Sequence, residues 1–153
     1  MRFHPEVLDP RQDEVLTSAG AAVAERGYRL GGGTAFALVF RHRESVDFDG
    51  FSEAVLLSLD DFGCMKLSAI AQRGSRKDFV DLFVLGREHR PLDELLELYQ
   101  RKFEVREIGH LLYSLVYFED AERDRMPGML WDATWEQVRE QVEDWVRGLA
   151  RRR

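Results

Sequence analysis

The sequence predicts an α+β fold that is mostly helical, with a small mixed or antiparallel sheet. Two short strand-like runs, at residues 28–30 and 46–49, lie among longer stretches whose apolar residues recur at helical spacing. The chain has 153 residues, of which 44% are apolar and 33% are charged, a composition typical of a folded domain with a real core. We expect a core at residues 1–90 and a helical part at residues 91–153 that packs on it.

The first part of the chain is expected to begin with a helix over residues 10–26. Its apolar side chains share one helical stripe, and Gly27 fits the left-handed cap that often ends a helix. The first strand follows directly, and a short helix at residues 34–40 leads to the second strand. The two strands are therefore expected to be joined by a helix rather than by a tight hairpin turn.

The rest of the chain is expected to be helical. Apolar residues keep helical spacing over residues 60–72, 75–88, 91–103, 108–115 and 134–149. Thr134 and Gln137 have the spacing of a capping box, and Ser75 and Asp78 have the same spacing in an acidic form. Asp78 therefore has two interpretations: a helix cap worth about 1 kcal/mol, or a catalytic carboxylate. Asp81 lies one turn further on among apolar residues, which favours a helix pressed into a core over a solvated position.

Two carboxylates on the second strand are the first candidates for chemistry. Strand side chains alternate between faces, so Asp47 and Asp49 are expected to point the same way and to repel each other. A divalent metal is a common partner of such a pair, since Mg²⁺ prefers one or two carboxylates together with substrate phosphates. The glycines at residues 31–33 would let backbone N–H groups at a helix start approach a phosphate. The alternative is an ordinary loop and two solvated acids, because motifs this short also occur by chance.

Two spaced motifs carry a family resemblance. Gly-Gly-Thr at residues 32–34 is followed by His-Arg-x-Ser-x-Asp-x-Asp at residues 42–49, and Lys66 is followed by Lys-Asp-x-x-Asp at residues 77–81. These motifs, together with residues 115–127, resemble the nucleotidyltransferase toxins of type IV toxin–antitoxin systems, the AbiEii/AbiGii-like abortive-infection proteins. The resemblance covers most of the chain, and it implies a nucleotidyltransferase core similar to that of DNA polymerase β.

The resemblance implies roles for particular residues. The implied catalytic residues are Asp47, Asp49, Lys66 and Asp81, and the implied nucleotide-binding residues are Gly32, Gly33, Thr34, Arg43, Ser45 and Asp78. Asp47 and Asp49 would hold Mg²⁺ or Mn²⁺, and Lys66 would neutralise charge on the phosphates of an NTP. Without the resemblance, Lys66 is most simply a surface lysine on an amphipathic helix.

The resemblance also implies partners. The acceptor would be RNA, in several family members the 3′ end of tRNA, and an antitoxin protein would be encoded beside the toxin. The sequence departs from the family at residues 51–61, where strands and a helix that usually separate the two motifs are missing. A shortened sheet indicates a second interpretation, a catalytically inactive remnant that serves as a protein-interaction module. Its strand edge would favour a homodimer, or the antitoxin, at Tyr28, Phe48 and Phe51.

Composition and residue spacing argue against several classes of protein. The net charge of −6 is unfavourable for a general nucleic-acid coat protein. Cys64 is the single cysteine, which excludes an internal disulfide, fits a reducing cytoplasm and is most simply a small buried side chain. The four histidines lack metal-ligand spacing, which argues against a zinc site. We expect a cytoplasmic protein with no membrane segment, because the sequence has no apolar run of membrane length.

The carboxylate pair generates the first testable expectation. Asp47→Ala or Asp49→Ala should abolish nucleotide transfer, because either change removes a metal ligand. The melting temperature should fall little, since the change also removes one of two like charges. Transfer of label from an NTP to RNA measures the first effect, and thermal melting measures the second. Full transfer by both variants would show that the metal is bound elsewhere.

Overall fold

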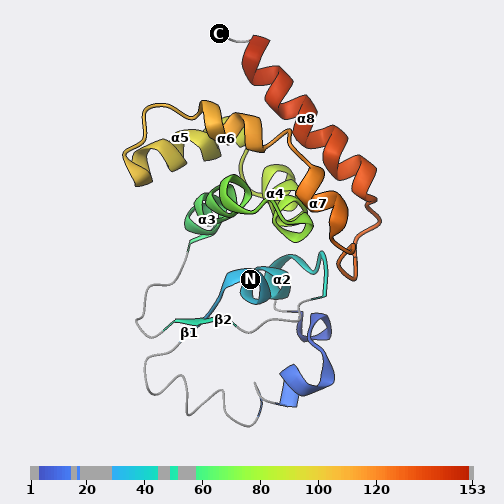
Figure 1. Cartoon of the computed structure of the whole chain (residues 1–153). Coiled ribbons are helices and arrows are strands. Elements are labelled where there is room, and N and C mark those ends of the chain that lie inside the picture. The colour runs from blue at the N-terminus through green and yellow to red at the C-terminus, as the bar shows by residue number, and fades with distance from the viewer. Residues whose placement is uncertain (1–3, 15–16, 18–28, 45–48, 52–57, 152–153) are drawn as a thin grey trace. The chain divides into compact units, whose positions relative to one another are not determined.

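The computed structural model describes residues 4–14, 17, 29–44, 49–51 and 58–151. Its contacts divide the chain into two compact units (Figure 1). Unit 1 comprises Met1–Leu57 and Pro127–Asp132, and unit 2 comprises Ser58–Met126 and Ala133–Arg153. The expected domain boundary at residue 90 falls inside unit 2 and stays a prediction.

Unit 1 holds the predicted small sheet. Strands β1 (Arg29–Gly31) and β2 (Asp49–Phe51) pair antiparallel, with Leu30 opposite Gly50. Helix α2 (Gly32–Phe40) joins the two strands, as the sequence predicts, and begins two residues earlier than expected. Tyr28 and residues 45–48 lie outside the described residues, so the predicted extents of both strands are tested only in part.

The described core of unit 1 is small. The short 3₁₀ helix η1 (Pro5–Val7) contacts α2, and Val7, Ala37 and Leu38 are buried together. The segment 127–132 closes this unit by backbone pairing, with the N–H of Leu130 donating to the carbonyl of His42 at 2.9 Å. The predicted first helix is described at residues 10–14 and 17, which are helical.

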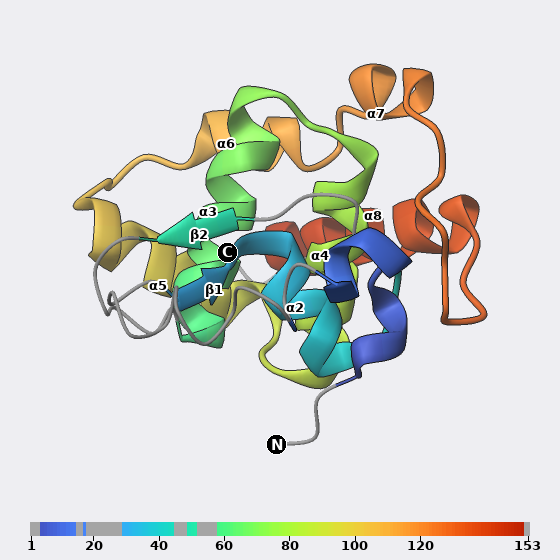
Figure 2. The same cartoon turned by 90° about the horizontal axis from the view of Figure 1, so that it is seen from below.

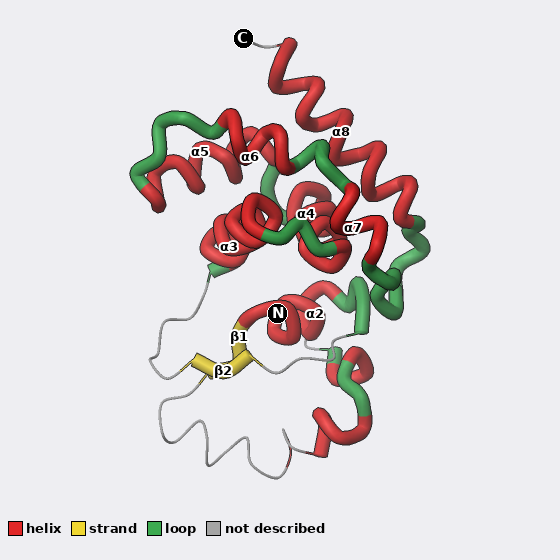
Figure 3. The backbone as a smooth tube through the Cα atoms, in the orientation of Figure 1, coloured by secondary structure: helices red, strands yellow, loops and turns green. Residues whose placement is uncertain are grey.

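The regular structure described in unit 2 consists of helices, which loops and turns connect (Figures 2 and 3). Its helices are α3 (Leu59–Gln72), α4 (Arg76–Glu88), α5 (Leu92–Phe103), α6 (Gly109–Ser114), α7 (Glu119–Arg123) and α8 (Trp135–Arg151). All except α7 lie where the apolar spacing predicts them. Among the described residues, two strands form a single sheet. This confirms the prediction of a mostly helical chain with a reduced sheet, but it does not identify a polymerase-β-like core. None of the described helices combines the length and apolarity needed to cross a bilayer.

The helix caps show where local sequence rules hold and where they fail. The predicted box at α8 is confirmed: the N–H of Thr134 donates to Gln137 Oε1 at 2.8 Å, and the N–H of Gln137 donates to Thr134 Oγ1 at 3.3 Å. At α4 the predicted box is wrong. Ser75 occupies the cap position, but its side chain makes no cap bond to the backbone, and its hydroxyl instead donates to the carboxylate of Asp78.

Helix α4 forms the centre of unit 2. Its residues from Asp78 to Leu85 are all buried, and it packs against α3, α7 and α8. The apolar stripe of α8 begins with Trp135, whose ring lies edge-on to Phe79 at 5.9 Å between centroids. Gly86, near the C-terminal end of α4, lies directly against the indole ring of Trp145 in α8. The absence of a side chain at Gly86 therefore sets how closely α8 approaches α4.

Two glycines in these helices should respond to alanine in opposite directions. Gly86→Ala should destabilise the chain by about 1–3 kcal/mol, because the added methyl would overlap the Trp145 ring. Gly148→Ala should stabilise it by about 0.5–1 kcal/mol, because a Cβ there meets nothing within 4 Å and alanine favours the helix. Urea unfolding of both variants checks the pair. Equal effects of the same sign would contradict the described packing of α8 on α4.

Candidate functional site

Three charged residues of the second sequence motif meet inside unit 2. Helix α3 carries Lys66, which is only 7% exposed, on the face that packs against α4. Asp78 and Asp81 lie three residues apart on α4, so both side chains emerge from one face of that helix. The Nζ atom of Lys66 lies 2.9 Å from Oδ1 of Asp78 and 2.8 Å from Oδ2 of Asp81. Both carboxylates are fully buried.

Further donors surround Asp78. Its Oδ2 accepts a bond from Nε of Arg73 at 3.1 Å and another from the Ser75 hydroxyl. Gly74, at a φ of +55°, makes the sharp turn between α3 and α4 that brings Arg73 back toward Asp78. Two cations and a hydroxyl therefore share a single buried carboxylate.

These contacts decide the charge states of Lys66 and Asp78. Burial alone would lower the pKa of Lys66, but the carboxylates of Asp81 and Asp78 outweigh it and raise that pKa above its ordinary value. Burial alone would raise the pKa of Asp78, but Lys66, Ser75 and Arg73 outweigh it and lower that pKa. Lys66 and Asp78 are both ionised at neutral pH as a result.

The contacts correct two interpretations from the sequence and agree with a third. Lys66 is not a surface lysine, because it is buried between two carboxylates. Asp78 is not a helix cap, because its oxygens accept from side chains of Lys66, Arg73 and Ser75. Asp81 is fully buried, which agrees with a helix pressed into a core. Arg73 and Ser75 are site residues that the motif did not include, although the basic run before Asp78 was a visible signal.

The remaining predicted site residues belong to unit 1. Gly32 and Gly33 form the first turn of α2, and Thr34 in the same turn is fully buried. Arg43 is also buried, and its Nη1 donates to the carbonyl of Glu44 at 2.9 Å. Asp49 opens β2, opposite Gly31 in β1. Asp47, Ser45 and the side chain of Asp49 lie outside what the structure describes, so the expected metal pair stays a prediction.

The donor set around Lys66 does not suit a metal ion. Asp78 and Asp81 each give an oxygen to the Lys66 ammonium, and Asp78 gives its second oxygen to Arg73. Within the described ranges, no three His, Cys, Asp or Glu side chains lie together as a possible metal site. The two aspartates therefore hold a lysine here, and a divalent cation would need other ligands.

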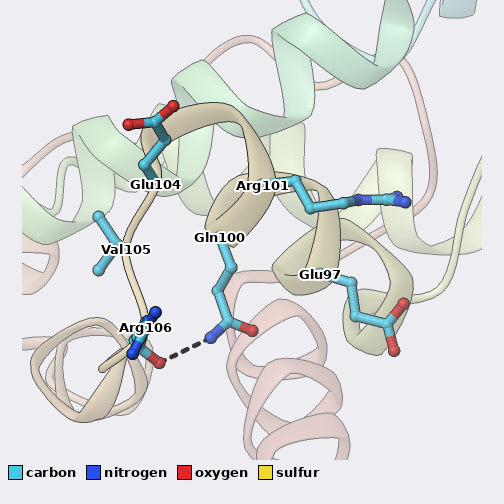
Figure 4. A pocket seen from close by; sticks show the side chains of 6 residues that line it. All are labelled: Glu97, Gln100, Arg101, Glu104, Val105 and Arg106. Atoms are coloured by element: carbon cyan, nitrogen blue, oxygen red, sulfur yellow. Dashed lines mark hydrogen bonds between the residues drawn. The ribbon is translucent and has the colours of Figure 1, made fainter.

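A wide surface depression at the end of α5 is a weaker candidate. It has a volume of about 670 Å³ and is lined by Glu97, Gln100, Arg101, Glu104, Val105 and Arg106. In Figure 4 these side chains point apart, and the drawn bond runs from Gln100 Nε2 to the backbone carbonyl of Arg106, at 2.8 Å. Ligand sites usually combine an apolar wall with a few converging polar groups. This depression lacks such convergence.

Comparisons with known proteins bear on the lysine–carboxylate site. A family model described as nucleotidyl transferase AbiEii toxin, type IV TA system, matches residues 50–151, a range that contains Lys66, Asp78 and Asp81. The match begins just after Asp49, so the glycine motif and the Asp-x-Asp motif precede it. A curated protein of Aquifex aeolicus (strain VF5), described only as uncharacterized, is 44% identical over 81 residues, or 52% of this chain and 38% of that protein. The chain thus spans well under two thirds of this relative. No solved structure matches.

The buried ion network generates an expectation about stability. Lys66→Met should lower the free energy of unfolding at pH 7 by about 3–5 kcal/mol, because it leaves Asp78 and Asp81 buried without their shared cation. The deficit should shrink as the pH falls, since protonation of a carboxylate relieves the repulsion in the variant. Urea unfolding at pH 7 and at pH 4.5 measures both effects.

Lys102→Met is the matched control. Lys102 is a half-exposed lysine that pairs with Asp61, and its removal should cost less than about 1 kcal/mol. Equal losses at Lys66 and Lys102 would contradict the buried network.

Proposed function

Because the chain belongs to the family of AbiEii nucleotidyl transferase toxins of type IV toxin–antitoxin systems, we propose that it transfers a nucleotide from an NTP to a hydroxyl group of RNA. The 3′ end of tRNA is the acceptor that we propose. The observation that carries the proposal is the Lys66 ammonium, held between Asp78 and Asp81 inside the part of the chain that the family model matches.

The arrangement of Lys66 suits a group that stabilises phosphate charge. An ammonium has three N–H donors, and Asp78 and Asp81 accept two of them. We propose that the third donor binds a phosphate oxygen of the NTP. Nucleotidyl transfer depends mainly on positioning and on electrostatic stabilisation of developing charge. A lysine fixed by two carboxylates is already in place, so little reorganisation is needed when the charge develops.

We propose Asp78 and Asp81 as the residues that set the position and charge of Lys66. Two buried carboxylates balance Lys66 and Arg73, so this group of four side chains carries no net charge. Arg73 reaches Asp78 from a largely exposed position, whereas Lys66 is nearly enclosed. Asp78 would therefore connect the exposed Arg73 guanidinium and the buried Lys66 ammonium, because it forms an ion pair with each.

We propose that the first motif, in unit 1, has nucleotide-binding and metal-binding roles of its own. The backbone N–H groups at Gly32 and Gly33, in the first turn of α2, would bind the triphosphate. Asp47 and Asp49 would be the ligands of Mg²⁺ or Mn²⁺, because Asp78 and Asp81 already hold Lys66. Such a metal supplies positive charge to the phosphates when it is bound.

We propose supporting roles for Thr34, Arg43 and Ser45, and a protein partner for the chain. Ser45 would hydrogen-bond a phosphate oxygen, and Thr34 and Arg43 would support the nucleotide-binding turn. An antitoxin protein is the proposed partner, since the family is one of toxin–antitoxin systems. The second candidate function, an inactive remnant that binds another protein, draws support from the two-stranded sheet and from the family match that starts after Asp49.

A transfer assay separates the two functions. The chain is incubated with Mg²⁺, tRNA and each labelled NTP in turn, and the RNA is resolved on a denaturing gel. We expect label from at least one NTP, and we expect Lys66→Arg to lower the rate roughly 100-fold, because the planar guanidinium cannot replace a compact ammonium between two carboxylates. Lys102→Arg is the matched control and should transfer at the normal rate.

Two results would count against this function. Absence of label with every NTP would favour the inactive remnant. Undiminished transfer by folded Lys66→Arg would show that Lys66 is not the group that binds the phosphate.

A further inference from the structure

The surface around the end of α6 exposes three large apolar side chains close together. Tyr113 lies in α6 and is 62% exposed, and Val116 and Tyr117, just after the helix, are 40% and 37% exposed. Within the described ranges, the other exposed side chains of this kind are Phe103 and Leu130, which lie elsewhere in the sequence. A concentration of exposed apolar side chains is typical of a binding surface.

The two tyrosine rings of this surface lie nearly parallel. Their centroids are 5.7 Å apart, and the ring planes differ by 22°. The hydroxyl of Tyr117 donates to Oε2 of Glu119 at 2.9 Å, which holds the Tyr117 ring in place. This hydrogen bond raises the pKa of Tyr117, so its ring is uncharged at neutral pH. Uncharged aromatic rings carry partial negative charge on their faces.

The charged groups beside the rings are acidic. Glu119 and Asp120 begin α7, and both are exposed. Their negative charges add to the rise in the pKa of Tyr117, so both carboxylates act on that ring. Asp120 shares its charge with Arg123, whose Nη1 lies 3.7 Å from Oδ1 of Asp120. Glu119, by contrast, contacts only the uncharged hydroxyl of Tyr117 among the described residues.

The backbone beneath the surface is held in shape. The N–H of Tyr117 donates to the carbonyl of Ser114 at 3.3 Å, which closes the turn after α6. Leu115 is fully buried and Phe118 is 7% exposed, so both anchor the same segment in unit 2. The exposed side chains therefore extend from a fixed backbone, and little conformational entropy would be lost when a partner binds.

We propose that this surface binds an arginine-bearing segment of a partner protein. A guanidinium is planar and positively charged, so it can stack on the face of a tyrosine ring while it forms hydrogen bonds to a carboxylate. Tyr113 would provide the exposed ring face, and Glu119 would provide the carboxylate. An apolar side chain next to the arginine would contact Val116. This partner site is additional to nucleotide transfer and does not depend on it.

Other aromatic rings of the chain already bind cations in this way. The guanidinium of Arg139 lies 5.2 Å from the centroid of the Phe118 ring. Phe103, the other exposed aromatic residue among those described, has the ammonium of Lys102 over its ring at 6.0 Å. Tyr113 differs from Phe103 because its neighbours are acids, so its ring is suited to a cation from outside the chain.

The same charges make nucleic acid the less favourable partner. An RNA strand would bring its phosphates close to the carboxylates of Glu119 and Asp120, and like charges repel. A cationic segment of a protein would instead be attracted to them. The acids therefore determine the charge of the partner, and the exposed tyrosines and Val116 determine its apolar character.

Peptide titration of the whole chain, followed by nuclear magnetic resonance, tests the proposal. The probe is the acetylated and amidated tripeptide Leu-Arg-Leu. In the control peptide, citrulline replaces arginine, which keeps the planar side chain but removes its charge. We expect saturable binding that shifts the ring signals of Tyr113 and Tyr117. The citrulline peptide should bind about fivefold more weakly or worse, because it makes neither the cation–π contact nor the ion pair.

Four variants identify the binding residues. Tyr113→Ala and Glu119→Gln should each raise the Kd for the arginine peptide about threefold or more, because one removes the ring and the other removes the charge. Tyr113→Phe keeps the ring and should bind as the unmodified chain does. Phe103→Ala is the matched control, because it removes an exposed ring that already has Lys102 over it, and it should leave the Kd unchanged.

Several results would overturn the proposal. They are absence of peptide binding, equal Kd values for the arginine and citrulline peptides, and unchanged binding by Tyr113→Ala and Glu119→Gln. A single-stranded RNA oligonucleotide that shifts the tyrosine signals at lower concentration than the arginine peptide would make this a nucleic-acid surface. A dimer, seen by light scattering, that Tyr113→Ala dissociates and Glu119→Gln leaves intact would make it an apolar contact between two copies of the chain.

The transfer assay keeps this proposal separate from the proposed function. Tyr113→Ala and Glu119→Gln should transfer nucleotide at the normal rate. Tyrosine-dependent binding of the arginine peptide by a chain that transfers no nucleotide would support the surface and contradict the enzyme. Lys66-dependent transfer by a chain that does not bind the arginine peptide would support the enzyme and contradict the surface.

Discussion

A lysine ammonium shared by two buried carboxylates is the interaction on which unit 2 depends. Removing three charges from water costs several kcal/mol for each ion, and the cost is recovered only where the geometry is close and the hydrogen bonds are complete. Lys66 meets that condition through Asp78 and Asp81, and Arg73 and Ser75 complete the bonds of Asp78. The network fixes the register of α3 against α4, because a slide of either helix would separate the charges.

The rest of unit 2 surrounds the helix that carries the two carboxylates. Arg76, at the start of α4, donates from Nε to the carbonyl of Ala121 at 2.9 Å and lies over the Trp135 ring, at 4.7 Å from its centroid. Glu122 accepts from Trp135 Nε1 at 3.0 Å and from Arg139 Nη1 at 2.7 Å. Helices α7 and α8 are thereby tied to the first turn of α4, where Asp78 lies. The segment at residues 115–127, part of the family resemblance, thus has a structural role in holding the site helix.

The sequence predicted most helices of unit 2, because their apolar residues keep a helical period and Thr134 caps α8 as its spacing indicates. It did not predict the burial of Lys66, although a signal was present: Phe62 and Ile70, four residues to either side, are buried on the same face. The predicted capping box at Ser75 was wrong because the Asp78 carboxylate instead accepts hydrogen bonds from Lys66 and Arg73. A rule based on local spacing does not take such tertiary contacts into account. The family motif grouped Lys66, Asp78 and Asp81, whereas it did not include Arg73, whose bond to Asp78 depends on the turn at Gly74.

We propose that the Lys66 ammonium, fixed by Asp78 and Asp81, binds the phosphates of a nucleotide. Nuclear magnetic resonance of ¹⁵N-labelled lysine side chains tests it most directly, because a buried, ion-paired ammonium exchanges its protons slowly with water. We expect a protected Lys66 signal at neutral pH that shifts when an NTP and Mg²⁺ are added, while the signal of Lys102 stays unchanged. A protected Lys66 signal that no NTP shifts would show that Lys66 does not bind the nucleotide.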